Sequence, residues 1–206
     1  MHKWLLPVLA VLATTLIGCS TDGRALAEPD LDQTTTTRPP PPTSAPVNEE
    51  SDTGLVLSSP DFEPGEAPPV DATCAGANRW PALEWSGVSD LASELAISLT
   101  NQTNPEEPLL LWLVAGISPE ETGMGPGVLP AGAFETLNDY GNQGWGNPCL
   151  ESFSDGSADM QFRLHVLEQP SGLAPGGAGN EAWDTLNAAA TDSASILMRT
   201  EATSAP

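Results

Sequence analysis

Short apolar runs separated by turn-forming residues limit the folds open to most of this chain. Each run is bounded by Pro, Gly, Asn or Asp, which interrupt regular structure, and such runs are typical of β-strands. A helix is expected over residues 180–190, where Asn180 can cap the start and Trp183, Leu186 and Ala190 repeat at i, i+3 and i+7. The sequence therefore predicts a mostly β domain with a late helix. The expected strands are residues 54–59, 95–100, 109–117, 162–168 and 194–200.

The N-terminus has the pattern of an export signal. Lys3 precedes an apolar run from Trp4 to Gly18, which is too short for a permanent membrane helix. The run ends at Leu16-Ile17-Gly18-Cys19, which resembles the bacterial lipobox, where a signal peptidase cuts before a lipidated cysteine. We therefore expect a signal peptide at residues 1–18 and acyl chains on Cys19 that hold the chain at the extracytoplasmic face of the bacterial membrane. An ordinary secretory signal is the alternative.

A tether is expected after the signal. Residues 19–53 are rich in Thr, Pro, Asp and Glu. Such a segment cannot bury enough apolar surface to fold, and its prolines favour an extended chain. One folded domain is then expected over residues 54–203.

Two cysteines remain once Cys19 is assigned to the lipid. Cys74 and Cys149 form an even pair in an oxidising compartment, where a disulfide is the usual outcome. Two buried free thiols are the alternative. A zinc site is less expected, because the mature chain keeps one histidine, His165, and has no CxxC spacing.

The chain is strongly acidic. It has 6 Lys plus Arg against 28 Asp plus Glu, a formal net charge of −22. A surface of this charge repels phosphate backbones, so nucleic acid is excluded as a partner.

Four segments, taken together and in order, resemble one family. They are LVLSSPDFEPGEAPP, TCAGANRWPALEWSGV, LLLWLVAGISPEETGMGPG and LNDYGNQGWGNPC, at residues 55–69, 73–88, 109–127 and 137–149. They are similar to segments of the phosphatidylethanolamine-binding proteins (PEBPs), which include Raf kinase inhibitor protein and bacterial YbhB/YbcL-like relatives. The resemblance implies an antiparallel Greek-key β structure with peripheral short helices. Bacterial members carry cysteines in the segments that hold Cys74 and Cys149, which supports their pairing.

The resemblance implies a shallow cavity for anionic groups, but this chain departs from the family at each ligand position. The family lines the cavity with an Asp-Pro-Asp-x-Pro loop, a histidine before a strand tryptophan, and a His-Arg-Tyr run. Here those places are taken by residues 101–105, by Leu111 before Trp112, and by Met160-Gln161-Phe162. Leucine and methionine cannot donate hydrogen bonds to an oxyanion. We therefore predict a degenerate anion pocket.

Two outcomes are open for the space that this site would leave. Aromatic and amide side chains could wall a neutral, amphipathic pocket, or Trp80, Leu111 and Met160 could simply fill the cavity. The candidate pocket residues are Trp80, Asn101, Gln102, Leu111, Trp112, Trp145, Asn147 and Met160.

We predict no catalytic residue, cofactor or metal. His165 lies inside an expected strand, where a histidine is more often structural than catalytic. Pairs of carboxylates carry little information in a chain with so many acids. The segment SDGSAD at 154–159 offers oxygens to calcium but lacks the EF-hand layout, so it is interpreted as a polar loop.

The leading hypothesis is a membrane-anchored, extracytoplasmic, PEBP-like binding or inhibitory protein that is not an enzyme. Its partners would be the membrane, through the lipid anchor, and an unidentified protein or small molecule. The alternative is a receptor for a small molecule or lipid headgroup that uses a rebuilt pocket near Trp145. A hydrolase that uses carboxylates is the least favoured hypothesis.

Overall fold

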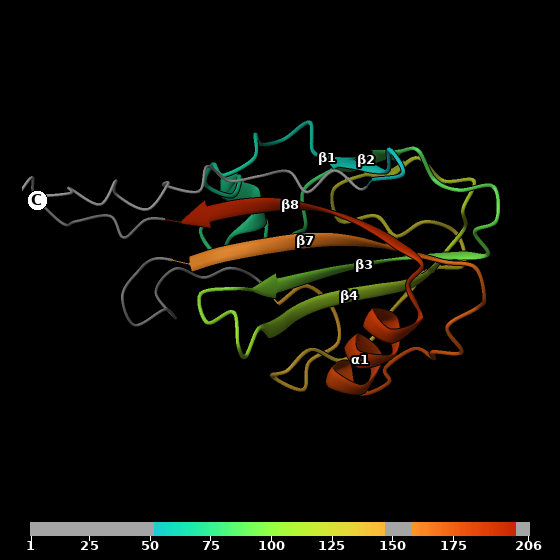
Figure 1. Ribbon diagram of the computed structural model, residues 1–206. Coiled ribbons are helices and arrows are strands. Elements are labelled where there is room, and N and C mark those ends of the chain that lie inside the picture. The colour runs from blue at the N-terminus through green and yellow to red at the C-terminus, as the bar shows by residue number, and fades with distance from the viewer. Residues whose placement is uncertain (1–51, 147–157, 201–206) are drawn as a thin grey trace, which may run out of the picture. The chain divides into compact units, whose positions relative to one another are not determined.

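The computed structural model describes residues 52–146 and 158–200, which belong to one compact unit, Thr43–Pro206. Most of the regular structure in these residues is β-strand (Figure 1). The elements are β1 Val56–Ser58, the 3-10 helix η1 Val70–Ala72, β2 Leu83–Ser86, β3 Glu94–Asn101, β4 Leu109–Ile117, β5 Gly123–Met124, β6 Phe134–Glu135, β7 Ala158–Leu167, α1 Gly179–Ala189 and β8 Asp192–Thr200.

The strands form two antiparallel sheets. The larger has the strand order β6-β4-β3-β7-β8 and the smaller has the order β1-β2-β5. The main core lies between them, because alternate residues of each strand point to the same face. It contains Leu57 of β1, Trp85 of β2 and Met124 of β5, together with Ile97, Phe162 and Ile196 of the larger sheet.

Helix α1 covers part of the other face of the larger sheet, on the side of β4 (Figure 1). Ala182 and Leu186 of the helix pack against Leu110 and Leu113 of β4 and Leu167 of β7. The expected helix is present, but the expected cap is wrong: the N-cap residue is Ala178, and Asn180 lies inside the first turn. The helix starts earlier because Gly179 lets it approach the carbonyl of Leu137, where a Cβ atom would overlap that oxygen.

The antiparallel, mostly β prediction is confirmed. Four expected strands correspond to β3, β4, β7 and β8, and the fifth is reduced to the three residues of β1. β7 begins at Ala158, earlier than expected, because it pairs with β8 over nearly its whole length. The short strands β2, β5 and β6 were not expected.

Strand β4 contains two β-bulges that shape the site. Leu99 pairs with Trp112 and Thr100 pairs with Leu110, so Leu111 is an extra residue without a partner on β3. A second shift lies near Gly116, which has a φ of 73°. The N–H of Gly116 donates to Oε1 of the buried Glu94 at 2.9 Å. Because a bulge interrupts strict alternation, Leu111 and Trp112 both join the core between the sheets.

Candidate functional site

Three of the candidate residues form one aromatic cluster, which we define as Trp80, Trp112 and Trp145 together with Phe162. Trp80 stacks on Trp112 with ring centroids 4.8 Å apart, and Trp145 meets Trp112 edge to face at 5.2 Å. Phe162 lies 6.0 Å from Trp145 and nearly parallel to it. These rings are in contact with one another, which is the arrangement of a packed core.

Each indole N–H of the cluster donates to the protein itself. Trp80 Nε1 donates to the carbonyl of Gly125 at 3.1 Å, and Trp145 Nε1 donates to the carbonyl of Ala72 at 3.1 Å. Trp112 Nε1 donates to Oε1 of Glu135 at 2.7 Å. The tryptophan donors are therefore already used within the fold.

The Gly-rich loop, here residues 137–146, is bound to the bulge of β4. The carbonyl of Leu111 accepts the N–H of Gly146 at 3.1 Å and Nδ2 of Asn138 at 3.3 Å. Asn138 Oδ1 in turn accepts the N–H groups of Tyr140 and Asn142. A Cβ atom at position 146 would overlap the Leu111 carbonyl, so this glycine permits a close backbone contact.

Among the residues that replace the expected anion ligands, most of those in strands are buried, whereas Thr103, Asn104 and Pro105 are exposed. Leu111 is 1% exposed and Met160 is 0% exposed. Asn101 pairs with Met160 across the sheet, and its Oδ1 accepts the N–H of Thr103 at 2.9 Å. Gln102 Nε2 donates to Oγ1 of Thr100 at 2.8 Å. Both amides thus have local partners.

Glu135 is a site residue that sequence reasoning missed. It belongs to the two-residue strand β6, which the sequence did not predict. Its carboxylate accepts the indole N–H of Trp112. The α-carbon of Gly144 lies close by, since a Cβ there would stand 3.5 Å from Glu135 Oε2. A half-buried carboxylate thus lies beside the aromatic cluster, where it would repel an anion.

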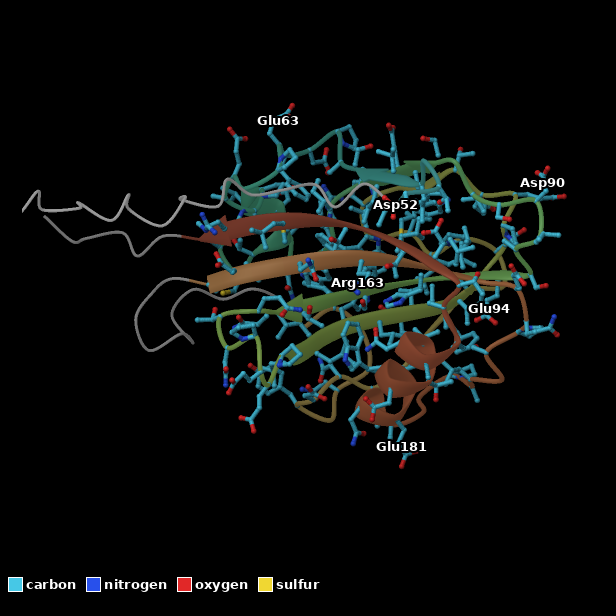
Figure 2. All side chains as sticks on the ribbon, viewed as in Figure 1. Asp52, Glu63, Asp90, Glu94, Arg163 and Glu181 are labelled. Atoms are coloured by element: carbon cyan, nitrogen blue, oxygen red, sulfur yellow. The ribbon has the colours of Figure 1, made fainter. Side chains whose placement is uncertain are left out.

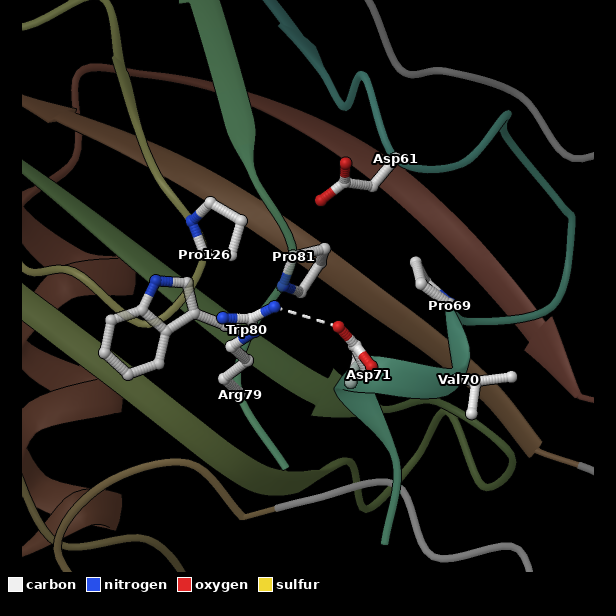
Figure 3. Close-up of a pocket in the computed structure, with 9 residues that line it drawn as sticks. Asp61, Pro69, Val70, Asp71, Arg79, Trp80, Pro81 and Pro126 are labelled. Carbon is white, nitrogen blue, oxygen red and sulfur yellow. Dashed lines mark hydrogen bonds and ion pairs between the residues drawn. The ribbon is translucent and has the colours of Figure 1, made fainter. Parts of the chain in front are cut away.

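A cavity of about 330 Å³ lies beside Trp80 (Figure 3). Among the described residues that line it, Trp80 is the one candidate pocket residue. The charged groups that line the cavity are Asp61 and an ion pair, in which Arg79 Nη2 donates to Asp71 Oδ2 at 2.9 Å. The described lining residues are Asp61, Pro69, Val70, Asp71, Ala72, Arg79, Trp80, Pro81 and Pro126.

His165 is enclosed in the fold. It is 1% exposed, its Nε2 lies 3.0 Å from Ser98 Oγ, and its ring meets Trp183 of α1 edge on at 5.6 Å. Burial, and to a smaller extent the nearby Arg163 guanidinium, lowers the pKa of His165 to about 3. The imidazole is therefore neutral over the usual range of pH.

Several predicted residues lie outside the described part of the chain. These are Cys19, Asn147, Cys149 and most of the 154–159 segment. Cys74 is not a free thiol, but its pairing with Cys149 stays a prediction. Asp159, the described acid of that segment, pairs with Arg199 at 2.7 Å.

Residues 52–146 and 158–200 contain neither a candidate membrane span nor a candidate metal cluster. No helix there has the length and apolar character needed to cross a membrane. Within the same ranges, His, Cys, Asp and Glu side chains form no group of three that could hold a metal ion.

These features define a two-sheet β protein in which a Gly-rich loop is fastened to a bulged strand over a buried aromatic cluster. The family model for phosphatidylethanolamine-binding protein matches residues 58–200. The chain belongs to this family.

Relatives and solved structures agree with the assignment. "Putative lipoprotein LppC" of Mycobacterium tuberculosis is 32% identical over 155 residues, which cover 75% of this chain and 74% of that protein. A UPF0098 protein of Mycobacterium bovis is 33% identical over 150 residues, which cover 72% of each chain. The crystal structure of Escherichia coli YbcL, described as a member of the mammalian PEBP family, shares the fold with a TM-score of 0.65 and 24% identity, over 71% of this chain and 98% of that one.

Proposed function

We propose that this protein is a lipid-anchored, extracytoplasmic binding or inhibitory module of the PEBP family, without catalytic activity and with a degenerate anion pocket. Support for the anchor comes from the lipobox-like residues 16–19 and from the name of the mycobacterial relative, "Putative lipoprotein LppC". The tether at residues 19–53 would let the domain reach away from the membrane. A disulfide between Cys74 and Cys149 belongs to the same proposal.

One observation carries the loss of anion binding. At the candidate site, a carboxylate of Glu135 holds the indole of Trp112, while Leu111 and Met160 are buried apolar side chains. An incoming phosphate would meet a negative charge and would find no imidazole to donate to it. It would also have to displace rings that already contact one another.

The absence of catalysis is supported by the surroundings of His165. The imidazole is buried beneath α1, bonded to Ser98 and faced by Trp183, so it has no access to a substrate. A serine or cysteine nucleophile needs a base that can reach the reacting group. His165 does not meet that condition.

The proposal is tested by titrating the whole chain with phosphate and phosphoethanolamine while tryptophan fluorescence is recorded. We expect no saturable response. Trp112 and Trp145 lie nearest to the degenerate anion pocket, so their fluorescence would change if an anion bound there. The decisive control is the double variant Asn101→Ala with Gln102→Ala. Saturable anion binding that this variant abolishes would overturn the proposal.

The alternative is a receptor with a rebuilt pocket near Trp145. It has weaker support, because the ring of Trp145 contacts Trp112 and its N–H is bonded to Ala72. A neutral sugar or short lipid that shifted the Trp145 signal in the same titration would favour it.

A further inference from the structure

The cavity beside Trp80 shares that one described residue with the candidate anion pocket, and three prolines stiffen its walls. Pro69, Pro81 and Pro126 line it together with Trp80 (Figure 3). Trp80 is itself fixed, since it stacks on Trp112 and donates to Gly125. Proline rings and a fixed indole lose little conformational entropy when a ligand binds, so this part of the cavity wall is preorganised.

The charges around the cavity favour a cation. The ion pair of Arg79 and Asp71 compensates one carboxylate, and Asp61 lies across the cavity from that pair (Figure 3). Asp61 Oδ2 accepts the N–H of Ala82 at 2.7 Å, which fixes the carboxylate without neutralising it. Within the described residues, the ion pairs of Arg79 and Arg199 go to Asp71 and Asp159. The charge of Asp61 is therefore available to a ligand.

Two aliphatic side chains at or near the cavity are open to solvent. Val70, which lines it, is 66% exposed, and Val128 is 64% exposed. Val128 lies in the same turn as Pro126. The N–H of Val128 donates to the carbonyl of Gly125 and closes this turn. Exposed aliphatic side chains around a small pocket are a common feature of protein-docking surfaces, where one anchor side chain enters the pocket.

We propose that this cavity is the anchor pocket of a protein-docking surface and receives an arginine or lysine side chain of a basic partner protein. The basic group would pair with Asp61, its aliphatic stem would lie against the prolines, and neighbouring apolar residues of the partner would contact Val70 and Val128. The cavity volume of about 330 Å³ suits one long side chain. A net charge of −22 would steer a basic partner toward this protein. The inference rests on the proposed binding function and names its partner class.

The first experiment compares two peptides that differ in charge and little in shape. The whole chain, labelled with ¹⁵N, is titrated with acetyl-Leu-Arg-Leu-amide and with the same peptide carrying citrulline in place of arginine. We expect the arginine peptide to shift the Trp80 indole and the Ala82 amide signals and to bind at least about tenfold more tightly, a difference of about 1.4 kcal/mol. Equal binding of the two peptides, or shifts confined to other residues, would overturn the inference.

Matched variants separate the local charge from the overall charge. Asp61→Asn removes the charge but keeps an oxygen that can accept the Ala82 N–H, and we expect it to weaken the arginine peptide about tenfold. Asp90→Asn removes one charge from an exposed position outside the cavity lining, on a different loop (Figure 2), and should change the affinity less than about twofold. Equal losses in the two variants would contradict a specific pocket.

A third variant tests the protein-docking part of the inference. Val70→Ser should weaken acetyl-Leu-Arg-Leu-amide while leaving acetyl-Gly-Arg-Gly-amide unchanged, because only the first peptide has apolar neighbours for Val70. If the unaltered chain bound the Leu-Arg-Leu and Gly-Arg-Gly peptides equally well, the cavity would recognise only the cationic side chain. That result would overturn the docking surface. Anion binding at the inherited site would instead overturn the proposed function, whatever the peptides do.

Discussion

At the scale of single residues, the site is set by side chains whose polar groups are already paired within the protein. Trp80, Trp112 and Trp145 all donate to protein oxygens, and Asn101 and Gln102 have local partners. Glu135 is the residue that changes the chemistry most, because it brings a carboxylate to the aromatic cluster. Its position could not be predicted from sequence, since nothing in the 131–136 segment indicates that it pairs with β4.

The buried imidazole of His165 predicts a pH dependence of stability. Its pKa is about 3 in the folded protein against 6.5 ordinarily. Between these two values the unfolded chain binds a proton that the folded chain does not, so stability falls as the pH is lowered through this window and the loss is complete below about pH 3. From pH 6.5 to 4 this group should remove about 3 kcal/mol, at about 1.4 kcal/mol per pH unit.

The measurement is urea unfolding of the whole chain and of His165→Gln at several pH values. Carboxylates titrate in both proteins, so the difference between the two curves isolates the histidine. The variant will be less stable at pH 7 if it disturbs packing, but only the slope matters. Parallel curves between pH 6.5 and 4 would show that His165 is not buried as a neutral group.

At the scale of elements, the contact between the Gly-rich loop and the bulge of β4 explains why residue 146 is glycine. Gly146→Ala would place a methyl group against the Leu111 carbonyl and Asn138 Nδ2. We expect a loss of about 2 kcal/mol or more in the free energy of unfolding, because two backbones would have to separate. Urea denaturation measures this loss.

Gly125→Ala is the matched control for that substitution. A Cβ atom at Gly125 meets nothing within 4 Å, so the change should cost well under about 1 kcal/mol. A Gly146→Ala protein as stable as the Gly125→Ala protein would mean that the loop is not fastened to the bulge.

The sequence predicts long elements better than short ones for a physical reason. β3 and β4 are apolar along most of their length because both faces of the larger sheet are covered there, and such runs stand out. β5 and β6 have two residues each. They pair with β2 and β4, and nothing in the sequence indicates this pairing. The bulge at Leu111 is also hidden, because one extra residue in an apolar run leaves no change in composition.

At the scale of the whole molecule, the family and its fold could be recognised from four sequence segments in the family's order. The three-dimensional arrangement of the candidate residues could not be predicted. The eight candidate pocket residues follow from the resemblance to the family. The structure places five of them in or against the core between the sheets, namely Trp80, Leu111, Trp112, Trp145 and Met160, and the three tryptophans pack with Phe162. The cavity beside Trp80 is formed mainly by loop residues near η1 and by Pro126, which are far apart in the sequence and share no pattern. Loop packing of this kind depends on tertiary contacts alone.

The proposed lipid anchor predicts where the protein is found. Cys19→Ser would remove the acylation site, and acyl chains are needed for stable attachment to the membrane. We expect the variant to leave the membrane fraction in cell fractionation, while Cys74→Ser should stay in it. Membrane retention of the Cys19→Ser protein would remove the lipid anchor from the proposed function.

The stacked pair of Trp80 and Trp112 gives the protein an intrinsic optical probe. Two indoles at 4.8 Å with planes 28° apart couple their electronic transitions, and Trp112 also meets Trp145 edge to face. Such coupling produces a circular dichroism couplet that depends on the relative orientation of the rings. Because Trp80 borders the cavity and Trp112 borders the Gly-rich loop, one spectrum would report on both places without any label.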